Sequence, residues 1–200
     1  MFGKKTFALA LLFVFLAASL ACGAPVILKL SNVLPDGNPT TDSMVFFAEK
    51  VKEKTGGTVE VRLFNNSALG GQREALESLQ AGTIEMCMAN AGPMGQFVPT
   101  MDVLSLPYVF QSTDHMFKAL NGKAGEMLKA DIDKAGFVFL YWGDGGSRNL
   151  INNKRPITKP EDLKGLKIRV MDSKLMVNTL NAMGAIATPM AQGEVYSALQ

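Results

Sequence analysis

The sequence predicts an α/β protein built of two lobes. From Val26 onward, short segments that alternate in polarity every second residue are followed by segments with helical periodicity. This order is typical of strand–helix units around a largely parallel sheet. A glycine-rich stretch, Gly143 to Gly146, interrupts the pattern, and we expect it to join a first lobe, residues 25–146, to a second, residues 147–200. An ordinary surface turn would have the same composition, so both interpretations of this stretch stay open.

Each predicted element has a local signal. The helix at 41–55 places Met44, Phe47 and Val51 on one face and stops at the glycine pair that follows it. The run 137–142 is almost continuously apolar, which is typical of a strand buried on both faces. The predicted strands span 26–33, 59–64, 84–89, 137–142 and 166–170, and the predicted helices span 41–55, 72–81, 112–120, 124–135, 158–165, 173–183 and 192–200.

The first 24 residues have the pattern of a secretory signal peptide. Two lysines, Lys4 and Lys5, precede Phe7 to Leu20, a run of 14 uncharged and mostly apolar residues that is too short for a permanent membrane span. Small residues suited to cleavage follow. Cys22 leaves two outcomes open: simple release, or lipid anchoring at this cysteine, although Ser19 stands where a lipidation signal prefers leucine. Either outcome places the protein outside the cytoplasm, in the periplasm.

Charge and reactive residues exclude several classes of function. The chain has 20 basic and 18 acidic residues, and because two lysines lie in the leader, the remainder carries 18 of each. Nothing therefore suggests a nucleic-acid partner. Cys87 lies in an apolar run and is expected to be a small buried hydrophobe, and His115 has no serine or cysteine constellation around it. We predict no catalytic residue, no metal site, no cofactor and no enzymatic activity.

Two arginines flank a capped turn in the last third of the chain. Thr158 and Glu161 have the spacing of a capping box, with Gly165 as the expected helix end. The following residues, 166–170, alternate so that Arg169 lies on the face opposite the apolar side chains. Arg169 could be a solvated strand residue. It also precedes a helix in an α/β pattern, where ligands bind beyond the strand ends, and a guanidinium grips a carboxylate at two points.

The sequence ITKPEDLKGLKIRVMDS, followed by NAMGAIATPMAQGEVYSALQ, resembles the solute-binding proteins of TRAP transporters (tripartite ATP-independent periplasmic transporters) of the dicarboxylate-binding, DctP type. The likeness runs from Leu28 to Gln200, with several motifs in the family's order. It implies a two-lobed fold like that of periplasmic binding proteins. The family's chains continue further, so we expect an N-terminal fragment whose second lobe is incomplete.

The resemblance also implies a set of site residues. Arg169 matches the arginine that clamps the ligand carboxylate, and Arg148 matches a second basic contact. Asp172 follows the arginine strand; it could bind a ligand hydroxyl, or it could cap the helix at 173–183, a role that Ser173 could equally fill. Gln192 departs from the family, where an aromatic residue is common. The predicted ligand contacts are Arg169, Arg148, Asp172, Asn90, Gln72 and Gln192.

The implied function is capture of a small organic acid between the lobes and delivery to the membrane subunits of a TRAP permease. Polar groups around two arginines favour a hydroxylated monoacid, with a C4-dicarboxylate as the second choice, because a second negative charge would lie near Asp172. Two alternatives stay open. One is the ligand-binding domain of an extracytoplasmic sensor, and the other is a periplasmic enzyme on the same fold.

Overall fold

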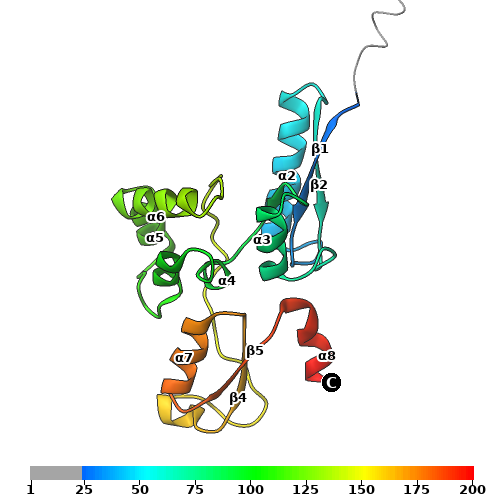
Figure 1. Ribbon diagram of the computed structural model, residues 1–200. Helices are drawn as coiled ribbons and strands as arrows, with labels where there is room; N and C mark the ends of the chain where they lie inside the picture. The colour runs from blue at the N-terminus through cyan, green and yellow to red at the C-terminus, as the bar shows by residue number, and fades with distance from the viewer. Residues whose placement is uncertain (1–23) are drawn as a thin grey trace, which may run out of the picture.

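The computed structural model describes residues 24–200 and has the predicted α/β class. The predicted signal peptide, with Cys22, lies outside the described residues apart from its last residue. Two parallel sheets lie in separate parts of the molecule, with the short helix α4 (Ala91–Met94) between them in Figure 1. Among residues 24–200, no helix combines the length and the hydropathy needed to cross a membrane. The exact division of the lobes at residue 146 stays a prediction.

The first sheet consists of three strands in the order β2-β1-β3, all parallel. They are β1 (Val26–Ser31), β2 (Val59–Phe64) and the short β3 (Met86–Cys87). Helix α2 (Pro39–Lys54) connects β1 to β2, and α3 (Gln72–Gln80) connects β2 to β3. Met44 of α2 is buried together with Leu30 and Val61 of the sheet, as its helical spacing predicts. The sheet therefore anchors the start of α3 at the carboxyl ends of its strands.

A helical layer packs beside this sheet. It contains α4, the 3₁₀ helix η1 (Pro99–Ser105), α5 (Thr113–Leu120) and α6 (Lys123–Lys134). Its core is formed by eight buried apolar side chains, namely Leu76, Met94, Val98, Met101, Leu120, Leu128, Ile132 and Phe137. Since Leu76 belongs to α3, this core fixes α3 and α4 relative to each other.

The second part of the chain forms a smaller parallel sheet of two strands, β4 (Lys167–Val170) and β5 (Ile186–Pro189), joined by helix α7 (Lys174–Ala182). Leu163, Leu166, Ile168 and Ala185 form its buried core. The 3₁₀ helices η2 (Pro160–Leu163) and η3 (Gln192–Glu194) and the short helix α8 (Val195–Leu199) complete it. The strand at 166–170 is confirmed, with Ile168 and Val170 buried and Lys167 exposed.

The strand predicted at 137–142 is wrong. The segment has no strand partner among the described residues, and Val138 is 83% exposed. Phe137 does enter the core, where its ring makes an edge contact with Phe97 at 6.0 Å, and Phe139 lies 4.3 Å from Trp142. A continuous apolar run predicts burial on both faces, but a strand also needs a neighbour for its backbone groups.

Two helix predictions also need correction. The capping box uses Asp162 rather than Glu161. The carboxylate of Asp162 accepts hydrogen bonds from the backbone N–H groups of Thr158 and Lys159 at 2.9 and 3.1 Å. The result is a single 3₁₀ turn instead of a helix, ended by Gly165 with φ +75° as predicted. The predicted helix 192–200 is divided into η3 and α8.

Candidate carboxylate-binding site

Arg169 lies on the face of β4 that the sequence predicts. Because Ile168 and Val170 point into the core, the side chain between them points away from it, and Arg169 is half-buried. Its Nε and Nη2 atoms donate to the carbonyl oxygen of Met190, which follows β5, at 3.0 and 2.6 Å. A guanidinium has five N–H donors, so this carbonyl fixes the group while leaving donors for a ligand.

Arg148 approaches the same strand end from the extended segment before η2. Its Nη2 lies 3.8 Å from the sulfur atom of Met171, the first residue after β4. Although Arg148 as a residue is exposed, its guanidinium is partly desolvated, which lowers its pKa. The pKa of Arg169 is also lowered, first by desolvation and then by the positive charge of Arg148.

The two guanidinium groups are therefore close enough to repel each other. Within residues 24–200, neither group forms an ion pair with a carboxylate. Partly buried cations normally have an anionic partner, because desolvation of an unpaired charge is costly. The arrangement suits an anion that comes from outside the chain.

Gln72 and Asn90 are brought together by a hydrogen bond. The Oε1 atom of Gln72, at the start of α3, accepts from the backbone N–H of Asn90 at 2.9 Å. Two residues further on, Gly92 packs so closely that a Cβ atom there would lie 3.0 Å from the sulfur of Met171. Since Met171 also contacts Arg148, Asn90 and Gln72 lie on the side of the first lobe that faces the arginines.

Asp172 does not cap α7. Ser173 is the N-cap: its hydroxyl accepts from the backbone N–H of Met176 at 3.4 Å, and the residue is buried. The Oδ2 atom of Asp172 instead lies 3.7 Å from Nη1 of Arg73 on α3. The backbone carbonyl of Asp172 accepts from Nε2 of Gln96 at 3.0 Å. Asp172 thus connects the end of β4 to α3 and to the segment before η1.

Arg73 is a residue that the sequence reasoning missed. It stands in the first turn of α3, where a cation opposes the helix dipole. That placement is electrostatically unfavourable, and it is the signal that could have drawn attention to Arg73. It also pairs with Glu77 one turn later, at 3.0 Å, so two carboxylates compensate it.

Gln192 is a predicted ligand contact, but its side chain has no hydrogen bond to the other predicted contacts in the described part of the chain. It begins η3 and is exposed. Its neighbours do approach the start of α3: a Cβ atom on Gly71 would lie 3.3 Å from Cβ of Ala191, and one on Gly193 would lie 3.4 Å from the Ser67 side chain. The element that carries Gln192 therefore borders the first lobe, while the role of its side chain stays a prediction.

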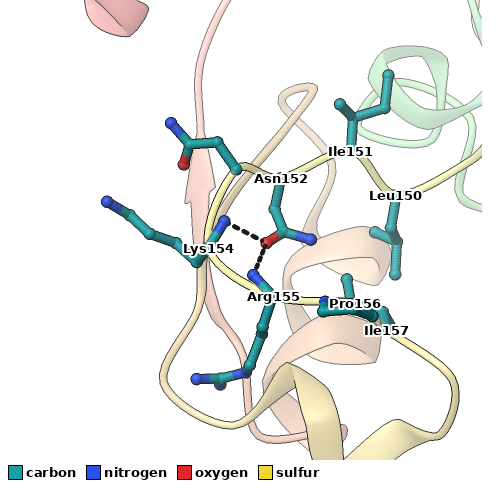
Figure 2. Close-up of a pocket in the computed structure, with 8 residues that line it drawn as sticks. Leu150, Ile151, Asn152, Lys154, Arg155, Pro156 and Ile157 are labelled. Atoms are coloured by element: carbon teal, nitrogen blue, oxygen red, sulfur yellow. Dashed lines mark hydrogen bonds between the residues drawn. The ribbon is translucent and has the colours of Figure 1, made fainter.

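A separate pocket, formed by residues 150–157, has its own internal partners. Figure 2 shows that Asn152 Oδ1 accepts from the backbone N–H groups of Lys154 and Arg155, at 2.8 and 3.0 Å. The guanidinium of Arg155 donates to the carbonyls of Asp162 and Lys164. The lining residues of this pocket include neither Arg148 nor Arg169. We interpret this pocket as a structural feature of the loop, whose polar groups bind one another and the η2 region, and not as part of the arginine site.

Two unpaired guanidinium groups near the carboxyl end of a parallel strand are chemically suited to bind an organic anion. Residues 30–200 match the family described as bacterial extracellular solute-binding protein, family 7, and the chain belongs to this family. The family resemblance predicted from the sequence is confirmed. This family consists of solute-binding proteins rather than enzymes.

Individual relatives agree with this assignment. A solute-binding protein of Chromohalobacter salexigens is 40% identical over 169 residues, which is 84% of this chain and 50% of that protein. A TRAP periplasmic solute-binding protein from Sulfitobacter sp. NAS-14.1 with bound β-D-galacturonate is 38% identical, with a TM-score of 0.84, over 86% of this chain and 58% of that chain. One from Sulfurospirillum deleyianum with bound succinate is also 38% identical, with a TM-score of 0.84, over 88% and 57%. The chain spans about half the length of the curated relatives it matches.

Proposed function

We propose that this protein is the extracytoplasmic solute-binding component of a TRAP transporter, and that it captures an organic acid by its carboxylate. The observation that carries the proposal is the pair Arg148 and Arg169, partly desolvated, mutually repelling and without a carboxylate partner in the described part of the chain. An anionic ligand would remove both the repulsion and the desolvation cost.

Arg169 is the better placed of the two to act as the clamp. Met190 holds its guanidinium by Nε and Nη2, so the group is oriented before a ligand arrives. A fixed, planar donor loses little conformational entropy on binding a carboxylate, and a charge-assisted contact to two oxygens is directional. Arg148, held by a weak contact to a sulfur atom, supplies the second charge and has more freedom to adjust.

The polar groups beside the arginines favour a hydroxylated monoacid. Gln72 and Asn90 are joined by a hydrogen bond, and Asp172 pairs with Arg73, which directly follows Gln72. Gln192 starts an element that borders the start of α3. Amide and carboxylate groups bind hydroxyls. Related structures hold a uronate in one case and succinate in another at equal identity, so similarity alone does not choose between them. The negative charge of Asp172 disfavours a second carboxylate nearby, which leaves the C4-dicarboxylates as the second choice.

Delivery of the bound acid to the membrane subunits of a TRAP permease is the further step of this proposal. The lobes would close over the acid, and the closed form would dock on the permease. Secretion through the leader at residues 1–24, with or without lipid anchoring at Cys22, would place the protein in the periplasm. Family membership supports these steps.

Thermal stabilisation by ligands tests the proposal. The full-length protein would be melted with uronates, aldonates, succinate and malate, and with neutral sugars as controls. A ligand at a hundred times its dissociation constant adds about 2.7 kcal/mol to the free energy of unfolding. We expect a rise in melting temperature with at least one acid and none with the neutral sugars. Equal shifts with acids and neutral sugars would contradict the proposal.

A further inference from the structure

Arg73 and Asp172 face each other across the two lobes, beside the arginine pair. Arg73 belongs to α3, directly after Gln72, and Asp172 stands three residues after Arg169. The 3.7 Å separation of Nη1 and Oδ2 joins elements that are 99 residues apart in the sequence. Gln96 holds the backbone of Asp172 from the first lobe as well, at 3.0 Å. Both the backbone and the side chain of Asp172 thus contact the first lobe.

The three arginines near the site fall into two electrostatic groups. Hydrogen bonding to Glu77 and the charges of Glu77 and Asp172 raise the pKa of Arg73, whereas the pKa values of Arg148 and Arg169 are lowered. Asp172 therefore compensates Arg73 and leaves the other two guanidinium groups unpaired. The three guanidinium groups and the carboxylates of Glu77 and Asp172 together carry a net charge of +1, which the charge of one carboxylate neutralises. The two oxygens of that carboxylate can accept hydrogen bonds from both free guanidinium groups.

We propose, on the basis of the function proposed above, that Asp172 sets the charge selectivity of the site by occupying Arg73. With Asp172 in place, Arg73 is not available to a second carboxylate, and the ligand end beyond the clamp meets an acceptor suited to hydroxyl groups. Without that carboxylate, Nη1 of Arg73 is exposed to the ligand as a third cation.

The selectivity is therefore a property of the pair and not of either residue alone. A monoacid such as a uronate satisfies the two free arginines and leaves the Arg73–Asp172 contact intact. A dicarboxylate must either approach Asp172 or break its contact with Arg73, and closure of the lobes over the ligand, as proposed above, would make both unfavourable by lowering the local dielectric. Glu77 does not replace Asp172, because it binds Nε of Arg73 from within α3.

The test compares D-galacturonate and succinate binding by calorimetry in the parent and in three full-length variants. Asp172→Asn keeps the shape of the side chain and removes its charge. We expect it to shift the ratio of the two affinities toward succinate by roughly tenfold, since a charged contact is gained and a repulsion is lost. The double variant Arg73→Gln/Asp172→Asn removes the freed cation, and we expect the gain to disappear. Glu60→Gln breaks an ion pair of similar exposure on β2, 2.8 Å long and outside the site, and we expect no change in the ratio.

The outcomes separate this inference from the proposed function. A parent protein that binds neither of these acids nor any other would overturn the proposed function, and this inference with it. A parent that prefers succinate, or an unchanged ratio in Asp172→Asn when the parent binds galacturonate, would overturn the selectivity role alone. A gain that persists in the double variant would also overturn it, because Arg73 would then not be the group that takes the second carboxylate.

Discussion

Arg155 and Arg169 both donate from Nε and Nη2 to backbone carbonyls, yet their surroundings differ. Arg155 binds two carbonyls, those of Asp162 and Lys164, and so closes the loop shown in Figure 2 onto η2. Arg169 directs the same two atoms to one carbonyl, that of Met190, and faces the positive charge of Arg148. Hydrogen bonds to backbone carbonyls therefore do not distinguish a structural arginine from one that binds a ligand. An unpaired second cation nearby is the more informative sign.

The largest effect on binding is expected at Arg169. Arg169→Lys keeps the charge but loses the planar donor geometry, and loss of a charge-paired buried contact costs about 2–5 kcal/mol. We expect the affinity for the acid, measured by calorimetry, to fall by tens to thousands of times.

Arg155→Lys is the matched control for that variant, because it changes the same side chain at the loop that Arg155 closes. We expect it to lower the melting temperature slightly and to leave affinity unchanged. Equal affinity of Arg169→Lys and the parent, with both proteins folded, would refute the clamp role of Arg169.

A smaller loss is expected for Arg148→Gln. This change removes one charged contact to the ligand, and hydrogen bonds to charged groups contribute about 1.5–3 kcal/mol. It also removes the repulsion that lowers the pKa of Arg169, so part of the loss is offset. We therefore expect the double variant with Arg169→Lys to be weaker than either single variant but less than additively. Strict additivity in calorimetry would mean that the two arginines do not share a ligand group.

Ser173 and Asp172 are adjacent, and replacing each by alanine separates capping from charge. Ser173→Ala removes the buried N-cap of α7, which typically costs about 1 kcal/mol of stability. Asp172→Ala removes an exposed ion pair worth about 0–1 kcal/mol, and so we expect the smaller change in melting temperature. A larger loss of stability from Asp172→Ala than from Ser173→Ala would show that Ser173 is not the residue that caps α7.

Cys87 is desolvated by burial and lies apart from the arginine pair. We expect modification of Cys87 to have the smallest effect on ligand binding. Burial raises the pKa of its thiol to about 11. The pKa of this thiol in the unfolded chain is about 8.5. Between pH 8.5 and 11 the unfolded state loses the proton while the native state keeps it, so the free energy of unfolding falls as the pH rises through this range. At pH 8 we expect a thiol reagent to react far more slowly with native than with unfolded protein. Rapid labelling of native protein at that pH would show that Cys87 is accessible.

Local signals in the sequence were enough for most elements of the fold. The period-two pattern at 166–170 placed Arg169 on the correct face, and the spacing of Met44 predicted the buried face of α2. The strand predicted at 137–142 was wrong, because hydrophobicity indicates a tendency to be buried but not the presence of a neighbouring strand. The prediction that Glu161 completes the capping box was also wrong. Asp162, one position later, has a shorter side chain that reaches the backbone N–H of Thr158.

The site was less accessible from sequence, because it depends on contacts between distant segments. The strand–turn position of Arg169 and the family resemblance indicated five further residues, and the structure brings Arg148, Asn90, Gln72 and Asp172 to one region. Arg73 was missed because its partner Asp172 lies in the other lobe. Two adjacent residues that are both preferred N-caps left the cap of α7 undecided, and the hydrogen bond from the backbone N–H of Met176 to the hydroxyl of Ser173 decides it in favour of Ser173.

Arg148 and Arg169 are proposed to recognise a carboxylate. The most direct measurement is a calorimetric titration of the full-length protein with the acid that stabilises it most and with the primary amide of the same acid. The amide keeps the size and the hydroxyl groups of the ligand and removes its charge. We expect the amide to bind tens to thousands of times more weakly, because it loses the charged contact to the two desolvated guanidinium groups. Equal affinity for the acid and its amide would contradict this role of the two arginines.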